Sequence, residues 1–412
     1  MINWLEEKLC ALNVTSSMNQ SEGFTRLGYS DEEKQAHTQF INIANELGLH
    51  TFEDEAGNQW AVWKVEENAP TIGLGSHLDT VYSGGGYDGV AGVLCALAAV
   101  KTLKDKQITP KKNIAVICFA SEESARFSVS TLGSKAVSGE LNKEAIKTIS
   151  DQDGTTIKQA MEQVGLNWEK VQQAERAESD LEQFLELHIE QGKILEDQGF
   201  DIGIVHGIAR PIRLSVRCEG MANHTGTTPM NNRQDALVAI APLINFVEQE
   251  ALKMNEREGA SIVATASVAT VKPNAMNMIP GEVELGIDIR STDNNLKQEL
   301  YASIYTFCES VEKDRNVKVM ITMLVNDASV ELDKEMQGKL FAVSKSLGYK
   351  TISMDSGAGH DVMNMALKWP SGLIFIPSHK GISHHPDEFT EIKDLANGTK
   401  VIAAYLESEV VG

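Results

Sequence analysis

The fold is decided by TIGLGSH (residues 71–77), VAGVLCALAAVKTLKD (residues 90–105) and KNIAVICFASEE (residues 112–123). The first and third segments are short apolar runs that predict buried strands, and the middle segment predicts an apolar helix. A strand, a helix and a second strand in this order predict a right-handed crossover within a parallel sheet. Ligands of such sheets bind beyond the carboxyl ends of the strands, where His77 and the pair Glu122 and Glu123 stand.

The pattern changes near residue 208. Segments that alternate apolar and polar residues, such as IRLSVRCEG, predict half-exposed strands between two long amphipathic helices. Residues 208–326 therefore predict a small antiparallel α+β domain. Buried-strand patterns return after it, so we expect this domain to be inserted into a discontinuous α/β domain of residues 1–207 and 327–412 with a central, mostly parallel sheet. The acidic stretch 161–186 predicts surface helices.

The composition of the chain limits the kinds of partner and the cellular locations that are expected for this protein. The chain has 412 residues and a net charge of −21, which argues against nucleic acid as a partner. No apolar run approaches the roughly 20 residues that span a bilayer, so no membrane association is expected. Five scattered cysteines without a CxxC pair, and an N-terminus without the features of a signal peptide, favour a reducing cytoplasm.

Four short segments, HLD, SEE, LHIE and GISHH, each place imidazole or carboxylate groups at a strand end or turn. Neutral imidazole and carboxylate oxygen are the ligands that zinc and similar ions favour. His77 and Asp88 flank a glycine-rich turn, and Asp88 is well placed to bridge two cations. Asp79 has two open interpretations, because it either caps the turn or holds the second ring nitrogen of His77.

The consecutive acids Glu122 and Glu123 follow a predicted strand. Side chains alternate along a strand, so the two carboxylates diverge unless the chain bends there. If the chain bends, one carboxylate is able to bind a metal while the other holds a water. That arrangement is typical of general-base hydrolysis.

Taken in order, the motifs of this chain resemble those of the hydantoinase/carbamoylase family of dinuclear metal amidohydrolases, within the aminoacylase and metallo-carboxypeptidase superfamily. The resemblance covers nearly the whole chain. The motifs that carry it are GSHLDT, GGGYDGVAGV, ASEESARF, LELHIEQGKILE, ANHTGTTPM, NMIPGEVELGIDIR, DSGAGHDVMNMA and IPSHKGISHHPDEFT.

The resemblance implies a catalytic domain that carries two divalent metal ions per subunit, with Zn²⁺ expected first and Mn²⁺, Co²⁺ or Ni²⁺ as alternatives. The inserted domain is expected to act as a lid and dimerisation domain. Placed motif by motif, the implied metal ligands are His77, Asp88, Glu123, His188 and His384, where His384 rather than His385 follows from the GISH alignment. The implied catalytic residues are Glu122, Asp79 and His224, and the implied substrate-binding residues are Gln191, His224, Asn277, Arg290, Gly359 and His360.

Physical chemistry agrees with two of these roles. A guanidinium such as that of Arg290 matches a substrate carboxylate, although a surface ion pair is its alternative role. His224, in the turn-rich NHTGTTP, is placed to donate to a developing oxyanion. The resemblance also implies a homodimer in which His224 and Asn277 serve the partner's active site.

The expected reaction is metal-dependent hydrolysis of the C–N amide bond of an N-carbamoyl or related N-acyl L-amino acid, a small molecule with a carboxylate. An allantoate amidohydrolase and an N-acyl-amino-acid deacylase or dipeptidase are the alternatives on the same scaffold. Pro211 stands where allantoate-processing members commonly carry Gln, which weighs against allantoate. From a different class, a small-molecule binding protein on a hydrolase scaffold is disfavoured because all ligand types are retained.

Overall fold

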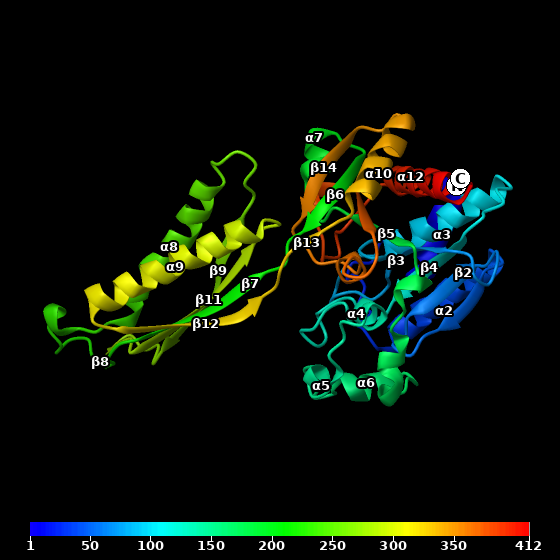
Figure 1. The fold of residues 1–412 in the computed structure, drawn as a ribbon. Helices are drawn as coiled ribbons and strands as arrows, with labels where there is room; N and C mark the ends of the chain where they lie inside the picture. Colours follow the sequence, from blue (N-terminus) through cyan, green and yellow to red (C-terminus); the bar gives the residue numbers. More distant parts are fainter. Residues whose placement is uncertain (412) are drawn as a thin grey trace. The chain divides into compact units, whose positions relative to one another are not determined.

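The computed structural model describes residues 1–411, which form two compact units (Figure 1). The first unit contains Met1–His206, Leu332–Ser356 and the chain from His360 onward, and the second contains Gly207–Glu331 with Gly357–Gly359. No helix among these residues is both long and apolar enough to cross a membrane. The lid and dimerisation roles of the second unit stay predictions.

The first unit is an α/β structure built on a nine-stranded sheet with the strand order β1-β2-β4-β3-β5-β15-β6-β13, where β14 also pairs with β6. The pairs β3–β4, β3–β5 and β5–β15 are parallel, as predicted for the centre of this sheet. The strands are β1 (His50–Glu53), β2 (Gln59–Trp63), β3 (Thr71–His77), β4 (Asn113–Phe119), β5 (Gln183–Ile189), β6 (Ile202–Ile208), β13 (Val330–Glu331), β14 (Thr351–Ser356) and β15 (Ser371–Ile376).

Burial on both faces explains why the central strands are almost uniformly apolar. Every residue of β4, β5 and β15 is buried, and α3 (Val90–Asp105) packs on the sheet with twelve buried residues of its own. The helices α1 (Ile2–Leu12) and α12 (Ile392–Val411) pack against α3 in the same core. The other helices are α2 (Asp31–Glu46), α4 (Leu132–Ser138), α5 (Lys143–Ile146), α6 (Ile157–Gln163), α7 (Ile194–Gln198), α10 (Lys334–Ser346) and α11 (Val362–Met365), with 3₁₀ turns η1 (Trp168–Ala174), η2 (Glu178–Asp180) and η4 (His379–Gly381).

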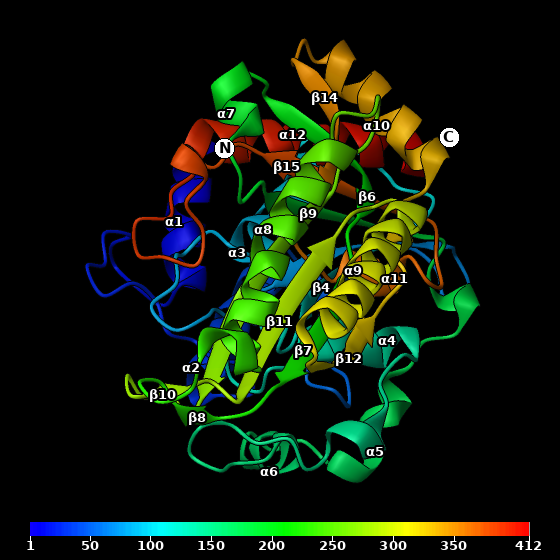
Figure 2. The same ribbon diagram turned by 90° about the vertical axis from the view of Figure 1, so that its left-hand side faces the viewer.

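The second unit is an antiparallel four-stranded sheet of order β12-β7-β11-β9, and α8 and α9 run side by side on it (Figure 2). Burial alternates along β7 and β11, so one face of the sheet packs in the core of this unit and the other is more exposed. The elements are β7 (Ile212–Glu219), β8 (Asn223–His224), η3 (Met230–Asn232), α8 (Ala236–Met254), β9 (Val263–Lys272), β10 (Met278–Ile279), β11 (Glu282–Arg290), α9 (Asn294–Arg315) and β12 (Lys318–Asn326).

The predicted surface helices of residues 161–186 are only partly present. The helix α6 ends at Gln163, and Gly165 follows with a φ of +98°, a backbone angle that favours glycine. After the two 3₁₀ turns η1 and η2 the chain enters β5 at Gln183, so the helical prediction is wrong for the end of this stretch. Its acidic composition resembles that of a solvated helix, whereas pairing with β3 and β15 decides the real structure.

Candidate metal centre and active site

The carboxyl ends of four neighbouring parallel strands meet at one edge of the large sheet. His77 is the last residue of β3, and His188 is the last but one of β5. Glu122 and Glu123 follow β4, and His384 follows β15. Because β4, β3, β5 and β15 are adjacent and run in the same direction, their ends gather these side chains at the same edge.

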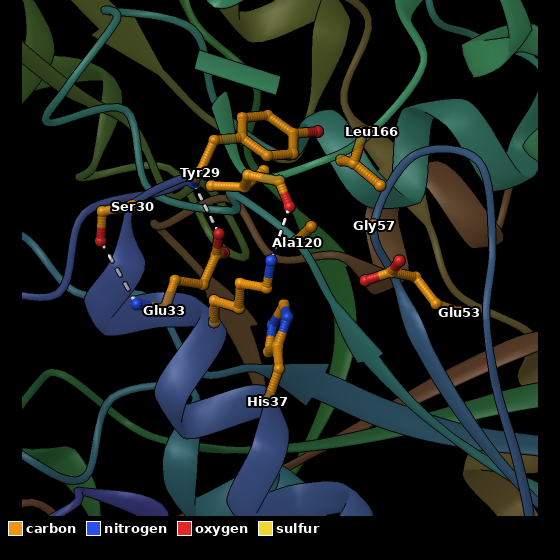
Figure 3. Close-up of a pocket in the computed structure, with 10 residues that line it drawn as sticks. Tyr29, Ser30, Glu33, His37, Glu53, Gly57, Ala120 and Leu166 are labelled. Atoms are coloured by element: carbon orange, nitrogen blue, oxygen red, sulfur yellow. Dashed lines mark hydrogen bonds between the residues drawn. The ribbon is translucent and has the colours of Figure 1, made fainter. Parts of the chain in front are cut away.

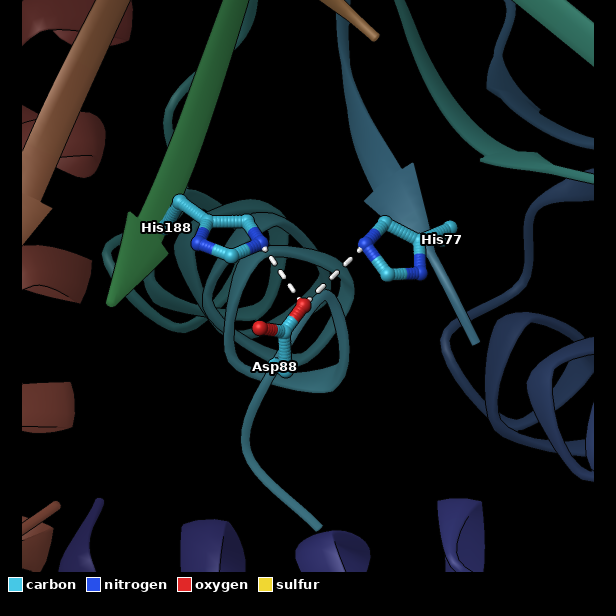
Figure 4. A group of neighbouring side chains, drawn as sticks. All are labelled: His77, Asp88 and His188. Carbon is cyan, nitrogen blue, oxygen red and sulfur yellow. Dashed lines mark ion pairs between the residues drawn. The ribbon is translucent and has the colours of Figure 1, made fainter. Parts of the chain in front are cut away.

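A first group of three buried side chains lies around the turn before α3. The Nε2 atoms of His77 and His188 are 3.4 Å and 3.2 Å from Oδ1 of Asp88, and Figure 4 shows both rings directed at this oxygen. One ligand atom from each residue lies within 4.8 Å of the other two. The spacing suits three ligands of one cation.

A second group shares Asp88. Nε2 of His384 lies 3.6 Å from Oδ2 of Asp88 and 3.2 Å from Oε1 of Glu123. The three ligand atoms of this group also lie within 4.8 Å of one another. Asp88 therefore directs one oxygen to each group.

The two groups fit divalent cations by their chemistry. Imidazole nitrogen and carboxylate oxygen are the donors that zinc and related ions take. A carboxylate between two such groups is the bridge that a two-metal site needs. The five ligands predicted from the sequence are thus brought together, while their role as ligands stays a prediction.

Backbone carbonyls orient both buried rings. Nδ1 of His77 lies 3.1 Å from the carbonyl oxygen of Asp79, and Nδ1 of His188 lies 3.0 Å from that of Ile189. The backbone N–H of Gly89 donates to Nε2 of His188 at 3.1 Å. Each Nδ1 thus donates its proton to a backbone carbonyl, and each Nε2 faces the centre of the first group.

Asp79 combines both interpretations that the sequence left open. Its Oδ1 and Oδ2 atoms accept the backbone N–H groups of Glu122 and Glu123 at 3.0 Å and 2.9 Å. Oδ1 also lies 3.4 Å from Nδ1 of His77, although the shorter contact of that nitrogen is with the Asp79 carbonyl. The carboxylate therefore holds the turn that carries the two acids as well as standing beside the ring.

The electrostatics of Glu122 suit proton transfer. Its Oε2 lies 3.7 Å from Nε2 of His77. Burial raises the pKa of Glu122 well above its usual value; His77 opposes this rise, whereas the charge of Glu123 adds to it. A carboxylate with a raised pKa is a stronger proton acceptor, and accepting a proton is the task of a general base.

The pKa of Asp88, the carboxylate shared by the two groups, is shifted in the opposite direction to that of Glu122. Burial alone would raise the pKa of Asp88, but the neighbouring His188 and His77 lower it well below its usual value. The hydrogen bond between Glu123 and His384 raises the pKa of His384 to about 9. These directions mark Asp88 as a permanent anion between imidazoles, a suitable bridge for cations.

Two predicted substrate-binding residues of the first unit lie beside the two groups of proposed metal ligands. Nε2 of Gln191 donates to Oδ2 of Asp88 at 2.6 Å. The ring of His360 is centred 4.4 Å from that of His188, and its Nε2 lies 3.0 Å from Oγ of Ser356. Burial, with the charge of His188 adding, lowers the pKa of His360 well below its usual value, so this ring is neutral.

The other predicted substrate-binding residues belong to the second unit. His224 pairs with Met278 in the β8–β10 ribbon, and the carbonyl of Asn277 accepts the N–H of Thr225 at 3.2 Å. Nδ1 of His224 accepts the N–H of Gly226 at 3.0 Å, so the proton of the neutral ring lies on Nε2. An exposed Nε2–H is the donor that an oxyanion needs.

Arg290 ends β11 beside the glycine-rich loop that contains Gly359. Its Nε donates to Oδ1 of Asp288 at 2.8 Å, and its Nη1 donates to the carbonyl of Gly357 at 2.9 Å. The surface ion pair that the sequence offered as an alternative is thus present. A guanidinium carries five N–H groups, more than these two bonds use.

Sequence reasoning missed a carboxylate that organises the site. Oε1 of Glu388 accepts the N–H groups of Tyr87 and Asp88 at 3.0 Å and 2.9 Å, and Oε2 accepts that of His384 at 3.3 Å. Glu388 thus holds the backbone of proposed ligands in both groups. The sequence offers one sign of this role, because Glu388 stands only four residues after His384. It gives no sign that Glu388 accepts from backbone N–H groups some 300 residues earlier in the chain.

The model of the peptidase family M20/M25/M40 matches residues 73–408. The chain belongs to this family. It is similar to the N-carbamoyl-L-amino acid amidohydrolase of Geobacillus stearothermophilus, with 35% identity over 385 residues, 93% of this chain and 92% of the relative. The ureidoglycolate hydrolase of Arabidopsis thaliana is 37% identical over 400 residues, 94% of this chain and 82% of the relative.

A solved structure supports the same relationship. The crystal structure of an amidase of the hydantoinase/carbamoylase family from Burkholderia multivorans has a TM-score of 0.87 at 27% identity, and the match covers 100% of this chain and 97% of that one. The resemblance predicted from the motifs is confirmed. This M20-family chain is a hydrolase of C–N amide bonds, and its family is metal dependent, in keeping with the ligand groups at Asp88.

Proposed function

We propose that this amidohydrolase removes an N-carbamoyl or related N-acyl group from an L-amino acid with the aid of two divalent ions per subunit. The observation that carries the proposal is Asp88, whose two oxygens face two separate sets of ligands, with Glu122 beside one of them. Zn²⁺ is the first candidate for both positions, because each set combines imidazole and carboxylate. When bound, such ions supply Lewis-acid polarisation of the scissile carbonyl.

Glu122 moves the proton in this proposal. Its carboxylate takes a proton from the attacking water and passes it to the leaving nitrogen. Asp79 accepts the backbone N–H of Glu122, and this hydrogen bond fixes the position from which the Glu122 side chain extends. For a carbamoyl group, the products are the free amino acid, ammonia and carbon dioxide.

Residues of the second unit recognise the substrate in this proposal. Arg290 receives the carboxylate of the amino acid through N–H groups that Asp288 and Gly357 leave available. His224 donates from Nε2 to the developing oxyanion, a contribution of about 3 kcal/mol in comparable sites. Asn277, Gly359, Gln191 and His360 complete the proposed set of substrate contacts.

A homodimer through the second unit is part of the proposal. The strand β9 is at the end of its sheet and exposes Val263 and Val268 at 63% and 54%. Leu252 on α8, the helix that packs beside β9, is 56% exposed. Apolar side chains along an unpaired strand edge favour association with a second copy.

A cytoplasmic location is also part of the proposal. It is supported by the five cysteines, which are all free thiols rather than disulfides.

The deciding experiment compares Glu122→Gln with Glu140→Gln, a matched change at an exposed glutamate. Both variants are assayed after metal reconstitution against N-carbamoyl, N-formyl and N-acetyl L-amino acids, dipeptides and allantoate. We expect the carbamoyl substrates to be turned over fastest and Glu122→Gln to lose roughly 10²-fold or more in kcat with its metal content unchanged. Near-normal turnover by Glu122→Gln would reject its role, and faster allantoate hydrolysis would reject the substrate class.

A further inference from the structure

Glu33 lies in the first turn of α2, outside the motifs that identify the active site. Its side chain is buried, with only 3% of the residue exposed. Oε2 accepts the N–H of Tyr29 at 2.6 Å (Figure 3), and Oε1 accepts the N–H of Ser121 at 2.7 Å. One oxygen therefore fixes the start of its own helix, while the other reaches 88 residues along the chain to the end of β4.

Ser121 is the residue at which the chain bends before Glu122 and Glu123. Its φ of +51° is in the left-handed region, which costs a non-glycine residue roughly 1 kcal/mol. This bend prevents the two following side chains from diverging as they would along a strand. A strained residue at such a position persists only when its surroundings hold it there.

Two carboxylates hold this bend through three successive backbone N–H groups. Glu33 accepts that of Ser121, and Asp79 accepts those of Glu122 and Glu123. The three N–H groups converge on acceptors from different segments of the chain. Each buried N–H would cost about 1–3 kcal/mol if it lost its acceptor, so the two carboxylates select one backbone conformation.

The segment before Glu33 also packs on this bend. A Cβ atom at Gly28 would lie 2.2 Å from Oγ of Ser121, so only glycine fits there without displacing the serine. Nη1 of Arg126 donates to the carbonyls of Gly28 and Tyr29 at 2.9 Å and 2.7 Å. The chain before α2 and the chain after β4 are therefore joined at several points.

We propose that Glu33 is a positioning residue that fixes the backbone at Ser121 and thereby aims the carboxylate of Glu122. The proposal rests on the proposed function of Glu122 as the general base. Glu33 forms no hydrogen bond or ion pair with the proposed metal ligands or with Glu122; it acts through the N–H of Ser121. Glu33→Gln retains the size of the side chain but turns an N–H₂ group toward one of its two N–H partners, so one hydrogen bond is lost.

The test compares Glu33→Gln with Ser30→Ala. Ser30 caps α2 by accepting the N–H of Glu33 at 3.3 Å and forms no hydrogen bond with Ser121. Loss of its hydroxyl therefore weakens the same helix by about 1 kcal/mol without releasing the bend. In the metal-reconstituted enzyme we expect Glu33→Gln to lower kcat by roughly tenfold or more with KM within about twofold and metal content unchanged. Ser30→Ala is expected to lower Tm but keep kcat.

Hydrogen exchange gives a readout that does not depend on activity. In Glu33→Gln, the amides of residues 121–123 are expected to exchange faster than in the wild type, whereas in Ser30→Ala they keep their protection. Equal kcat and equal exchange in the two variants would overturn the proposal. If Glu122→Gln retains turnover, the proposed function fails, but the exchange of residues 121–123 still decides whether Glu33 fixes the bend.

A second variant covers the case in which Glu33→Gln does not fold. Gly28→Ala pushes on Ser121 from the other side and leaves both carboxylates in place. We expect this variant to lose kcat at unchanged KM and to expose the amides of residues 121–123 to exchange. Wild-type kcat and protection in Gly28→Ala would overturn the proposal.

Discussion

Oδ1 of Asp79 accepts the backbone N–H of Glu122 at 3.0 Å. This bond links the residue two positions after the proposed ligand His77 to the proposed base, so one carboxylate connects two strand ends of the candidate active site. The proposed function of the site therefore depends on carboxylates that hold the backbone as well as on the proposed metal ligands and general base.

Replacement of Asp79 by Asn is predicted to impair catalysis more than folding. The amide keeps one acceptor for the N–H groups of Glu122 and Glu123, while its N–H₂ group opposes the other. We expect kcat to fall by roughly 10–100-fold in steady-state assays, with the far-UV circular dichroism of the wild type. Asp394→Asn, a change at a buried aspartate in the first turn of α12, is the control. Equal activity in the two variants would contradict this role.

The metal content of variants is predicted to depend on whether the replaced residue belongs to one group of proposed ligands or to both. His384 belongs to one group and Asp88 to both. We expect His384→Ala to retain about half of the wild-type metal after reconstitution and dialysis, and Asp88→Ala to retain almost none, as measured by elemental analysis. Exposed His385 offers the matched control, because His385→Ala is expected to bind metal as the wild type does. The same metal content in His384→Ala and Asp88→Ala would rule out two separate groups.

Mixed dimers are predicted to restore activity. If His224 serves the partner's site, a dimer of one Glu122→Gln subunit and one His224→Ala subunit contains one intact site. After denaturation and refolding of the two variants together, about a quarter of the wild-type activity is expected from the random pairing of subunits. Each variant refolded alone is the control. Absence of any recovery, with mixed dimers present by native mass spectrometry, would show that the site is formed within one subunit.

The buried His37 is predicted to reduce stability in acid. Burial lowers the pKa of His37 to about 4, and the ring is only 6% exposed. The unfolded state therefore binds a proton that the folded state does not between pH 6.5 and 4, so stability falls as the pH drops through this window. The shift corresponds to about 3 kcal/mol. Urea unfolding at pH 7 and pH 4 is expected to show a smaller loss of stability in His37→Gln than in the wild type or in His50→Gln, an exposed control. Equal losses in all three proteins would contradict this effect.

The sequence predicted the parallel sheet and the alternating strand β7 because their patterns are local. The apolar runs of β3 and β4 and the helix α3 between them lie within 49 residues of chain, and the alternation in β7 is visible in eight. The five proposed ligands were recognisable because each belongs to a short motif at a strand end or turn. The strand β5 was hidden by the acidic segment before it.

The carboxylates that hold the backbone could not be predicted in the same way. Glu33 and Glu388 are ordinary acids in sequence, and their function arises from backbone N–H groups brought to them by the fold over 88 and 300 residues. Any carboxylate is able to accept from any N–H, so no residue type marks the partner. Only coordinates reveal which N–H each acid receives.

The central claim is that Asp88 bridges two cations. Anomalous diffraction at the zinc edge, from crystals of the zinc-reconstituted protein, tests it most directly. We predict two peaks, one on the side of Asp88 that faces His77 and His188 and one on the side that faces Glu123 and His384. A single peak, or peaks remote from Asp88, would contradict the account.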